Sequence, residues 1–271
     1  MLTDLAHRLG WTPTWCRDLC EFYRVSPSEA LRLGTRATGR RPSLPGSPTC
    51  QPVSGKTWEE LWALEPRDSE EAIFSFWKQV GSWCAFRQVV RNRRRSFAFI
   101  GKRLGMMDAF CEYGAGVAPA SWWLATHHPG PLRLTMVDVP SEHLTFGAWR
   151  LRKRLENEWD LCCWALRVIA LEPHIQPLTD PYRGISCLEV LEHLSHPLET
   201  VQHLAEHLEF GGYLWEDFVP HAEAHGADLP QAQSARHAVY DFLEQHFALV
   251  EGRRWDMADG GGTRTWQRQL V

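Results

Sequence analysis

Residues 111–118 read Cys-Glu-Tyr-Gly-Ala-Gly-Val-Ala, a short apolar segment that runs into two closely spaced glycines. An apolar run from Leu132 to Val137 follows and ends in Asp138. A strand, a glycine turn, a helix, a second strand and an acidic residue about 20 residues after the turn form the layout of a nucleotide-binding βαβ unit. The glycines let the backbone come close to a ligand, and the carboxylate can accept hydrogen bonds from a ribose diol.

The composition is that of an ordinary globular protein, with 271 residues, 44% hydrophobic and 23% charged. The net charge of −4 gives no general attraction for nucleic acid. The sequence contains no apolar run of about 18 residues and no signal-peptide pattern at its start, so we expect no membrane span. None of the eight cysteines forms a C-x-x-C pair. This usage predicts buried free thiols in a reducing compartment, and hence a cytoplasmic protein.

The region before the glycine turn has helical periodicity in two segments, residues 2–34 and 58–90, joined by a segment rich in Pro, Gly, Ser and Arg. Within the first segment, Ser26 precedes Pro27 and stands three residues before Glu29, which is a good helix start. A helix-turn-helix reader of DNA would need a basic recognition helix, and none is evident. We therefore expect a helical lid or a dimerisation element.

Two compositional features of this region allow both a structural and a functional interpretation. Many of the fourteen tryptophans lie before or near the glycine turn, where they can pack the core or line a pocket for a flat or cationic ligand. The basic run Arg91, Arg93, Arg94 and Arg95 can be a solvated helix end or a clamp for a phosphate or carboxylate.

From residue 106 onward the pattern alternates between strand and helix, which predicts an α/β fold with a parallel sheet covered on both faces. We expect strands at 106–112, 132–137, 166–171, 184–188 and 212–219, helices at 119–127, 141–155, 197–208 and 231–246, and a closing antiparallel pair at 247–251 and 263–270. In such sheets the ligand binds at the carboxyl ends of the strands.

A second motif follows the expected fourth strand, where residues 188–197 read Leu-Glu-Val-Leu-Glu-His-Leu-Ser-His-Pro. Together with residues 112–118 and Asp138, this segment resembles the class I S-adenosylmethionine-dependent methyltransferases, in particular the ubiquinone-biosynthesis-like branch. The resemblance covers residues 105–271 and implies a Rossmann-like methyltransferase domain that binds S-adenosylmethionine. Residues 1–104 match no family and are expected to form a separate helical, Trp-rich region that covers the substrate.

The resemblance also implies which residues contact S-adenosylmethionine, with Asp138 holding the ribose hydroxyls. The expected cofactor-binding residues are Glu112, Gly114, Ala115, Gly116, Asp138, Val139, Glu172, Leu188 and Glu189. Two positions depart from the family pattern: Ala118 replaces a usual glycine, and Arg183 stands where many members carry an Asp.

The spacing Glu189-x-x-Glu192-His193 raises the possibility of a metal site. Positions i, i+3 and i+4 project to one side of a helix, and two carboxylates with an imidazole suit a divalent ion. Some members of the branch, including small-RNA 2′-O-methyltransferases, bind a metal through a similar motif, which implies His221 and His225 as further ligands here. The alternative is a helix start without metal, in which case His193 or His221 is the candidate catalytic base.

We expect a methyltransferase that acts on a small molecule, preferably at oxygen, where a metal ion or a base helps to remove the acceptor's proton. An RNA 2′-O-methyltransferase is the first alternative, favoured by the basic run and opposed by the acidic net charge. A non-catalytic cofactor-binding scaffold and a nicotinamide-dependent dehydrogenase are the others. Nucleic acid and membrane partners are not expected, and a homodimer is left open.

Overall fold

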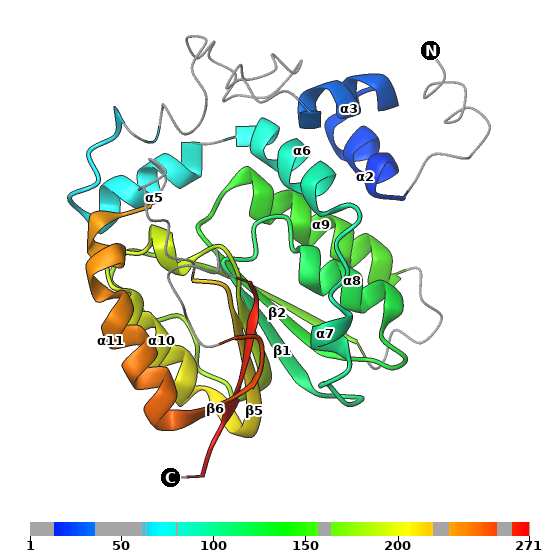
Figure 1. The fold of residues 1–271 in the computed structure, drawn as a ribbon. Helices are drawn as coiled ribbons and strands as arrows, with labels where there is room; N and C mark the ends of the chain where they lie inside the picture. The colour runs from blue at the N-terminus through cyan, green and yellow to red at the C-terminus, as the bar shows by residue number, and fades with distance from the viewer. Residues whose placement is uncertain are drawn as a thin grey trace.

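A computed structural model describes residues 14–35, 62, 64–79, 81–156, 164–218, 228–253 and 262–270. Within them, one seven-stranded sheet has the order β3-β2-β1-β4-β5-β7-β6 (Figure 1). The strands are β1 (Ala109–Tyr113), β2 (Arg133–Asp138), β3 (Ala165–Ala170), β4 (Tyr182–Cys187), β5 (Leu208–Glu216), β6 (Phe247–Glu251) and β7 (Arg264–Arg268). Strands β1 to β5 pair in parallel, whereas β7 runs antiparallel to both β5 and β6. The predicted α/β fold and the closing antiparallel pair are confirmed.

The starts of β1 and β5 differ from the predicted ones by three or more residues, for local reasons. Strand β1 begins at Ala109 and not at residue 106, because Met106 is exposed and Met107 has a left-handed backbone with φ +66°. Strand β5 begins at Leu208, before Gly211 and Gly212, whereas the expected strand starts at residue 212. Gly211 has φ +72° and lies in β5, where the register against β4 shifts. The glycines therefore mark an irregularity within the strand and not its start.

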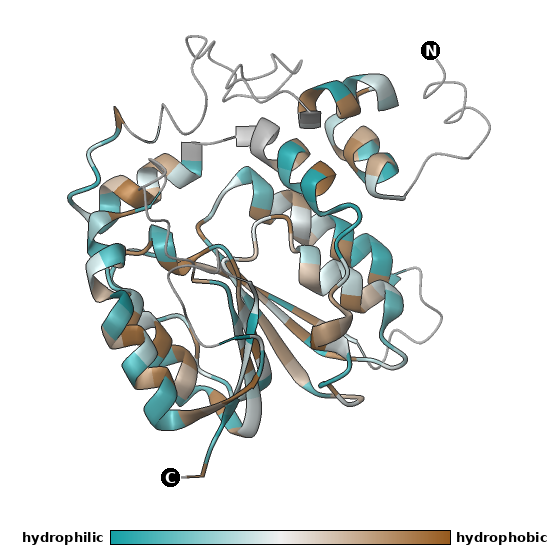
Figure 2. Ribbon diagram, viewed as in Figure 1, coloured by the Kyte–Doolittle hydropathy of each residue, from teal (hydrophilic) through white to brown (hydrophobic). Residues whose placement is uncertain are grey.

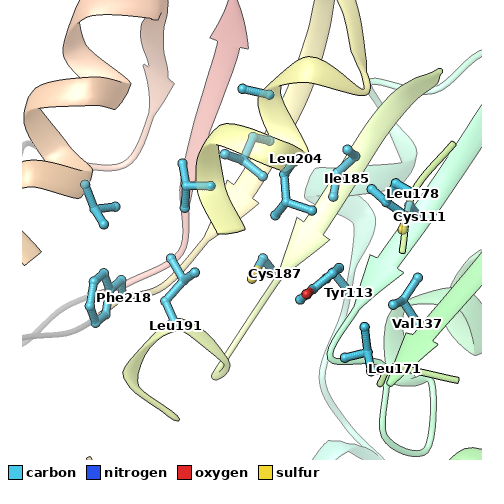
Figure 3. Close-up of a cluster of buried hydrophobic side chains, with 14 of the residues drawn as sticks. Cys111, Tyr113, Val137, Leu171, Leu178, Ile185, Cys187, Leu191, Leu204 and Phe218 are labelled. Atoms are coloured by element: carbon cyan, nitrogen blue, oxygen red, sulfur yellow. The ribbon is translucent and has the colours of Figure 1, made fainter. Parts of the chain in front are cut away.

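Helices cover both faces of the sheet, as Figure 1 shows. Helices α8 (Pro119–His127) and α9 (Glu142–Glu156) cover one face, and α10 (Pro197–Glu206) and α11 (Pro230–His246) cover the other. The buried residues of α11 recur with helical spacing, so hydrophobic and hydrophilic positions alternate along it (Figure 2). Figure 3 shows part of the core between the sheet and α10, where Ile185, Cys187 and Leu204 come together.

The helical N-terminal region is also confirmed over the described residues. It contains α2 (Thr14–Tyr23), α3 (Pro27–Thr35), α5 (Glu70–Gln79), α6 (Gly81–Asn92) and the short α7 (Ala98–Gly101). The Ser26 hydroxyl accepts a hydrogen bond from the Glu29 N–H at 3.2 Å, as its sequence pattern predicts. A third core cluster, which includes Leu19, Leu33, Phe86 and Phe146, packs α2 and α3 against α6 and α9.

Two further expectations can be compared with the described residues. Cys16, Cys20, Cys111 and Cys187 are buried free thiols, as predicted. No helix in the described part of the chain is long and apolar enough to cross a membrane.

A buried ion pair attaches the reversed strand β7 to the sheet. Glu216, at the end of β5, is fully buried and accepts hydrogen bonds from Arg264 Nε at 2.6 Å and from Trp266 Nε1 at 2.9 Å. The Tyr240 hydroxyl donates to the same carboxylate at 3.3 Å. One carboxylate thus joins β5, β7 and α11.

Replacing Arg264 with Met should lower the free energy of unfolding by about 3–5 kcal/mol, because the Glu216 carboxylate stays buried without its counter-ion. Urea denaturation at neutral pH measures this loss. The double variant Arg264→Met/Glu216→Gln should recover part of the stability, since the buried charge is then gone. A loss below about 1 kcal/mol in the single variant would mean that the pair behaves like an exposed one.

Candidate functional site

A cavity of about 470 Å³, here called the edge cavity, lies at the carboxyl ends of β1, β2 and β3. Its floor includes Gly114, Gly116, Asp138, Val139, Glu172 and Glu189. Its roof comes from the N-terminal helices, through Ile73, Phe74 and Trp77 of α5 and Gln88 and Arg91 of α6. The cavity therefore lies where an open α/β sheet binds its ligand, and the helical region covers it.

The glycine turn has a backbone that only glycine adopts without strain. Gly114 and Gly116 have φ of +70° and +51°. A Cβ atom on Gly114 would lie 2.1 Å from Val190 Cγ2, and one on Gly116 would lie 2.6 Å from Gln88 Oε1. The turn is therefore packed closely between the segment after β4 and helix α6.

Glu112 holds the helix that follows this turn. Its carboxylate accepts hydrogen bonds from the N–H groups of Ala120 at 2.9 Å and Ser121 at 2.8 Å, in the first turn of α8. Burial raises the pKa of Glu112, while these hydrogen bonds act in the opposite direction. The side chain is thus directed at the helix N-terminus.

Asp138 is bound to the glycine turn from the neighbouring strand. Its Oδ2 accepts a hydrogen bond from the Gly116 N–H at 2.5 Å, and its Oδ1 accepts one from the Val139 N–H at 2.6 Å. Burial raises the pKa of Asp138 to about 6, against the effect of these two hydrogen bonds. The carboxylate is therefore fixed at the wall of the edge cavity and changes its charge near pH 6.

A smaller hollow of about 110 Å³ adjoins the edge cavity on the other side of the turn. Its lining includes Glu112, Ala115 and Leu188, and it shares Gly114 and Glu189 with the edge cavity. All nine residues predicted to contact a cofactor therefore lie on these two adjoining hollows. Of the roof residues, Arg91 has a signal in the sequence through the basic run, and Trp77 has one through the many tryptophans; Ile73, Phe74 and Gln88 have none.

Cations from the end of α6 lie between the roof and the segment after β4. Arg91 Nη2 donates to Glu189 Oε1 at 2.6 Å. Arg95 lies 3.9 Å from the Glu189 carboxylate and 3.8 Å from that of Asp217. Arg91 and Arg95 both line the small hollow, whereas Arg94 lines neither hollow. Part of the basic run is thus placed to meet an anionic group.

The predicted metal set does not assemble. Glu189 has φ +55° and turns toward Arg91, and the next residues form a 3-10 helix, Leu191–His193, in place of an α-helical turn. The His193 Nε2 atom lies 4.0 Å from Glu192 Oε1. In the described part of the chain, the group of ligand atoms within 4.8 Å of one another is a different one, His203, Glu206 and His207 on and just after α10.

In this structure Glu189, Glu192 and His193 therefore do not converge, and metal binding through them stays a prediction. Glu192 is buried, which raises its pKa to about 8, and its Oε2 has no hydrogen-bond partner. His221 and His225 lie outside the described residues, so their proposed roles stay predictions.

His193 itself faces the edge cavity. Its ring lies 5.6 Å from that of Trp77, which belongs to the roof. His196 and Glu199 also line the edge cavity. The cavity thus has an indole and imidazole groups in its lining besides the predicted cofactor residues.

Comparison with known proteins identifies the fold family. Residues 85–256 match the family described as a methyltransferase domain. The chain belongs to this methyltransferase family. It is a class I S-adenosylmethionine-dependent methyltransferase, as the sequence motifs imply; the ubiquinone-biosynthesis-like branch stays a prediction.

Solved methyltransferase structures resemble the chain at low sequence identity. A methyltransferase from Pyrococcus furiosus is 12% identical, with a TM-score of 0.43, and the match covers 67% of this chain and 85% of that one. The N-methyltransferase NodS from Bradyrhizobium japonicum WM9 is 18% identical, with a TM-score of 0.42 and coverage of 67% and 94%. A methyltransferase from Aquifex aeolicus is 15% identical, with a TM-score of 0.44, and the match covers 63% of this chain and 88% of that one. The comparison with curated proteins gave no match.

The two departures from the family pattern have different structural consequences. Ala118 has φ +53°, a left-handed backbone that costs a non-glycine residue about 1 kcal/mol, and its carbonyl accepts a hydrogen bond from Arg150 Nη2 at 3.1 Å. Arg183 lies near the amino end of β4, with its guanidinium over the Tyr213 ring. It is therefore at the opposite edge of the methyltransferase sheet from the cavity.

His174, which belongs to no sequence motif, connects the roof helix α5 to the loop after β3. His174, in the loop after β3, has its Nδ1 2.9 Å from Glu70 Oε2 and its Nε2 2.7 Å from Glu71 Oε1. Both carboxylates lie in the first turn of α5. The hydrogen bond with Glu71 raises the pKa of His174. Because His174 and Glu70 also line the edge cavity, this contact closes one end of it.

We expect this contact to weaken as the pH rises through the raised pKa of His174, since only the charged imidazole donates to both carboxylates. Hydrogen exchange of α5, corrected for its intrinsic pH dependence, should be faster at pH 8 than at pH 6. In the His174→Ala variant exchange should be fast at both pH values. Equal protection of α5 in the wild type at both pH values would contradict this role.

Proposed function

We propose that the protein transfers the methyl group of S-adenosylmethionine to an oxygen atom of a small molecule held beneath α5. The observation that carries the proposal is the mixed lining of the edge cavity. The same cavity is lined by the predicted adenosine-binding residues Asp138, Val139 and Glu172 and by Trp77 and His193, which can face an acceptor. An indole and an imidazole suit a flat or partly apolar acceptor with one polar group.

The arrangement of charges supports a cofactor that spans both hollows. Asp138 would receive the ribose hydroxyls, and the amino-acid end would extend past Gly114 into the small hollow. There Arg91 and Arg95 are within reach of a carboxylate, which would take the place of Glu189 as their partner. Both ends of the ligand would then meet side chains of matching charge or hydrogen-bonding type.

The sulfonium of S-adenosylmethionine supplies an already activated methyl group. The chain's own contribution is therefore to align the acceptor, to exclude water and to accept a proton. The roof of α5 and α6 covers the cavity, and Trp77 limits how the acceptor can lie. His193, which lines the cavity beside Trp77, would accept the proton of a hydroxyl acceptor without a metal ion.

The affinity for S-adenosylhomocysteine should increase as the pH rises through about 6, because Asp138 is protonated below this value and an ionised carboxylate is the better acceptor for two hydroxyls. Calorimetric titration at pH 5 and pH 7.5 should show a gain of about tenfold, the change expected for one group with this pKa. In the matched variant Asp138→Asn the affinity should be lower and nearly independent of pH. The same pH dependence in both proteins would remove Asp138 from the ribose role.

The acceptor role is tested by methyl transfer from labelled S-adenosylmethionine to a panel of phenols, alcohols, amines and thiols. We expect products methylated at oxygen, and a decrease in kcat of about 100-fold in His193→Ala, the contribution typical of a general base. The affinity for S-adenosylhomocysteine should not change in this variant. His196 lines the same cavity, and the control variant His196→Ala should change KM more than kcat. Products only at nitrogen or sulfur, or full activity of His193→Ala, would contradict the proposal.

A further inference from the structure

A second large cavity lies between α2, α6, α8 and α9; it shares no lining residue with the edge cavity, but Asn92, Arg95 and Pro119 line both it and the small hollow. It measures about 680 Å³ and is here called the basic cavity. Six cationic side chains line it, namely Arg17, Arg93, Arg95, Arg150, Lys153 and Arg154, against the two carboxylates of Asp18 and Glu21. This excess of positive charge stands out in a chain whose net charge is −4. The cavity therefore favours an anion.

The most informative group in the basic cavity is Arg150, which is only 3% exposed. Its Nη2 donates to the Ala118 carbonyl at 3.1 Å, and its Nε has no hydrogen-bond partner. Burial lowers its pKa only to about 10, so the guanidinium stays charged at neutral pH. A buried, charged donor without an acceptor is costly, and an anionic ligand in the cavity would supply the acceptor.

The carboxylates of the cavity are already matched by one cation. Lys153 Nζ lies 3.4 Å from Asp18 Oδ1 and also contacts the Glu21 carboxylate. Arg93 and Arg150, by contrast, donate to backbone carbonyls, which carry no full charge. Arg150 is also attracted by Asp18 and Glu112, but the six cations of the basic cavity outnumber its carboxylates, so an excess of positive charge remains for a ligand.

Aromatic rings occupy the same walls. Trp15, Trp122 and Trp123 line the cavity and are half-buried. The Arg150 guanidinium lies over the Trp122 ring, 5.0 Å from its centroid. Indole rings beside guanidinium groups are the combination that proteins use for a base and its phosphate. The volume is also within the usual range for a small organic ligand.

We propose that the basic cavity binds a nucleoside phosphate, with the phosphate on Arg93 and Arg150 and the base against the indoles. Free nucleotides and single-stranded RNA both carry this chemistry. The proposal also gives a place to most of the basic run, because Arg91 lines the edge cavity, Arg93 lines the basic cavity, Arg95 lines the basic cavity and the small hollow, and Arg94 lines none of them. It does not depend on the proposed methyl acceptor.

The test is a set of titrations of the full chain with uridine diphosphate, uridine, inorganic phosphate and an oligouridylate of about ten nucleotides, a length that single-strand binders cover. A uridine base is used because the adenosine part of the edge cavity could itself bind an adenine nucleotide. Each titration is done with and without saturating S-adenosylhomocysteine. Uridine diphosphate should bind at least about tenfold more tightly than uridine, since the phosphate makes the charged contacts.

Two neighbouring arginines give a matched pair of variants. Arg93→Gln should weaken the binding of uridine diphosphate by about five- to tenfold, as expected for one lost charge-assisted contact. Arg94→Gln removes the same charge one residue away, outside the cavity, and should change the affinity by less than about twofold. Both variants exchange an exposed side chain, so the fold should be unaffected.

The outcomes are distinct. Tighter binding of the oligonucleotide, with a steep salt dependence, would identify RNA as the source of the ligand, and equal affinity would identify a free nucleotide. Absence of saturable binding by every probe would overturn the proposal. So would equal effects of Arg93→Gln and Arg94→Gln, or displacement of uridine diphosphate by S-adenosylhomocysteine. These results do not bear on the edge cavity, so failure here is separate from failure of the proposed methyl transfer.

Discussion

The hydrogen bond from the Gly116 N–H to the Asp138 carboxylate joins the ends of two adjacent parallel strands, and the geometry of the edge cavity depends on it. It fixes the glycine turn against β2, while Glu112 fixes the start of α8 on the other side of the turn. The left-handed glycines then allow Val190 and Gln88 to approach the backbone closely. Two carboxylates thus shape the turn before any ligand is present.

The roof follows from this arrangement. Helices α5 and α6 lie over the turn, and their buried faces pack into the core clusters through Ile73 and Phe74 of α5 and Phe86 of α6. Two contacts at the rim add to this packing, Arg91 with Glu189 and His174 with the first turn of α5. Because such ion pairs are weak and sensitive to pH or salt, apolar packing carries most of the attachment of the roof.

Much of this could be predicted from the sequence, because alternating strands and helices, a glycine turn and an acidic strand end have local signatures. The nine cofactor residues lie together since parallel strands end at a common edge. The predicted metal ligands Glu189, Glu192 and His193 do not come together, because the left-handed backbone of Glu189 and the 3-10 turn after it break the helical spacing that the prediction assumes. The division of the basic run between two cavities could not be predicted, since α6 ends at Asn92 and its periodicity stops there.

His174 shows which kind of residue cannot be predicted from the sequence. Its function in the roof comes from two glutamates that are far away in the sequence, and nothing in its own surroundings signals the contact. Arg150 is similar, because only packing of α9 against the turn buries its guanidinium and places it at a cavity. Such residues act through tertiary contacts, which local periodicity and motif spacing do not report.

The most direct test of the account is a crystal structure of the protein with S-adenosylhomocysteine. The account predicts the ribose on Asp138, the adenine between Val139 and Glu172, and the amino-acid carboxylate on Arg91 or Arg95, with Glu189 displaced from its present partner. A ligand bound outside the edge cavity, or a ribose held by residues other than Asp138, would contradict it.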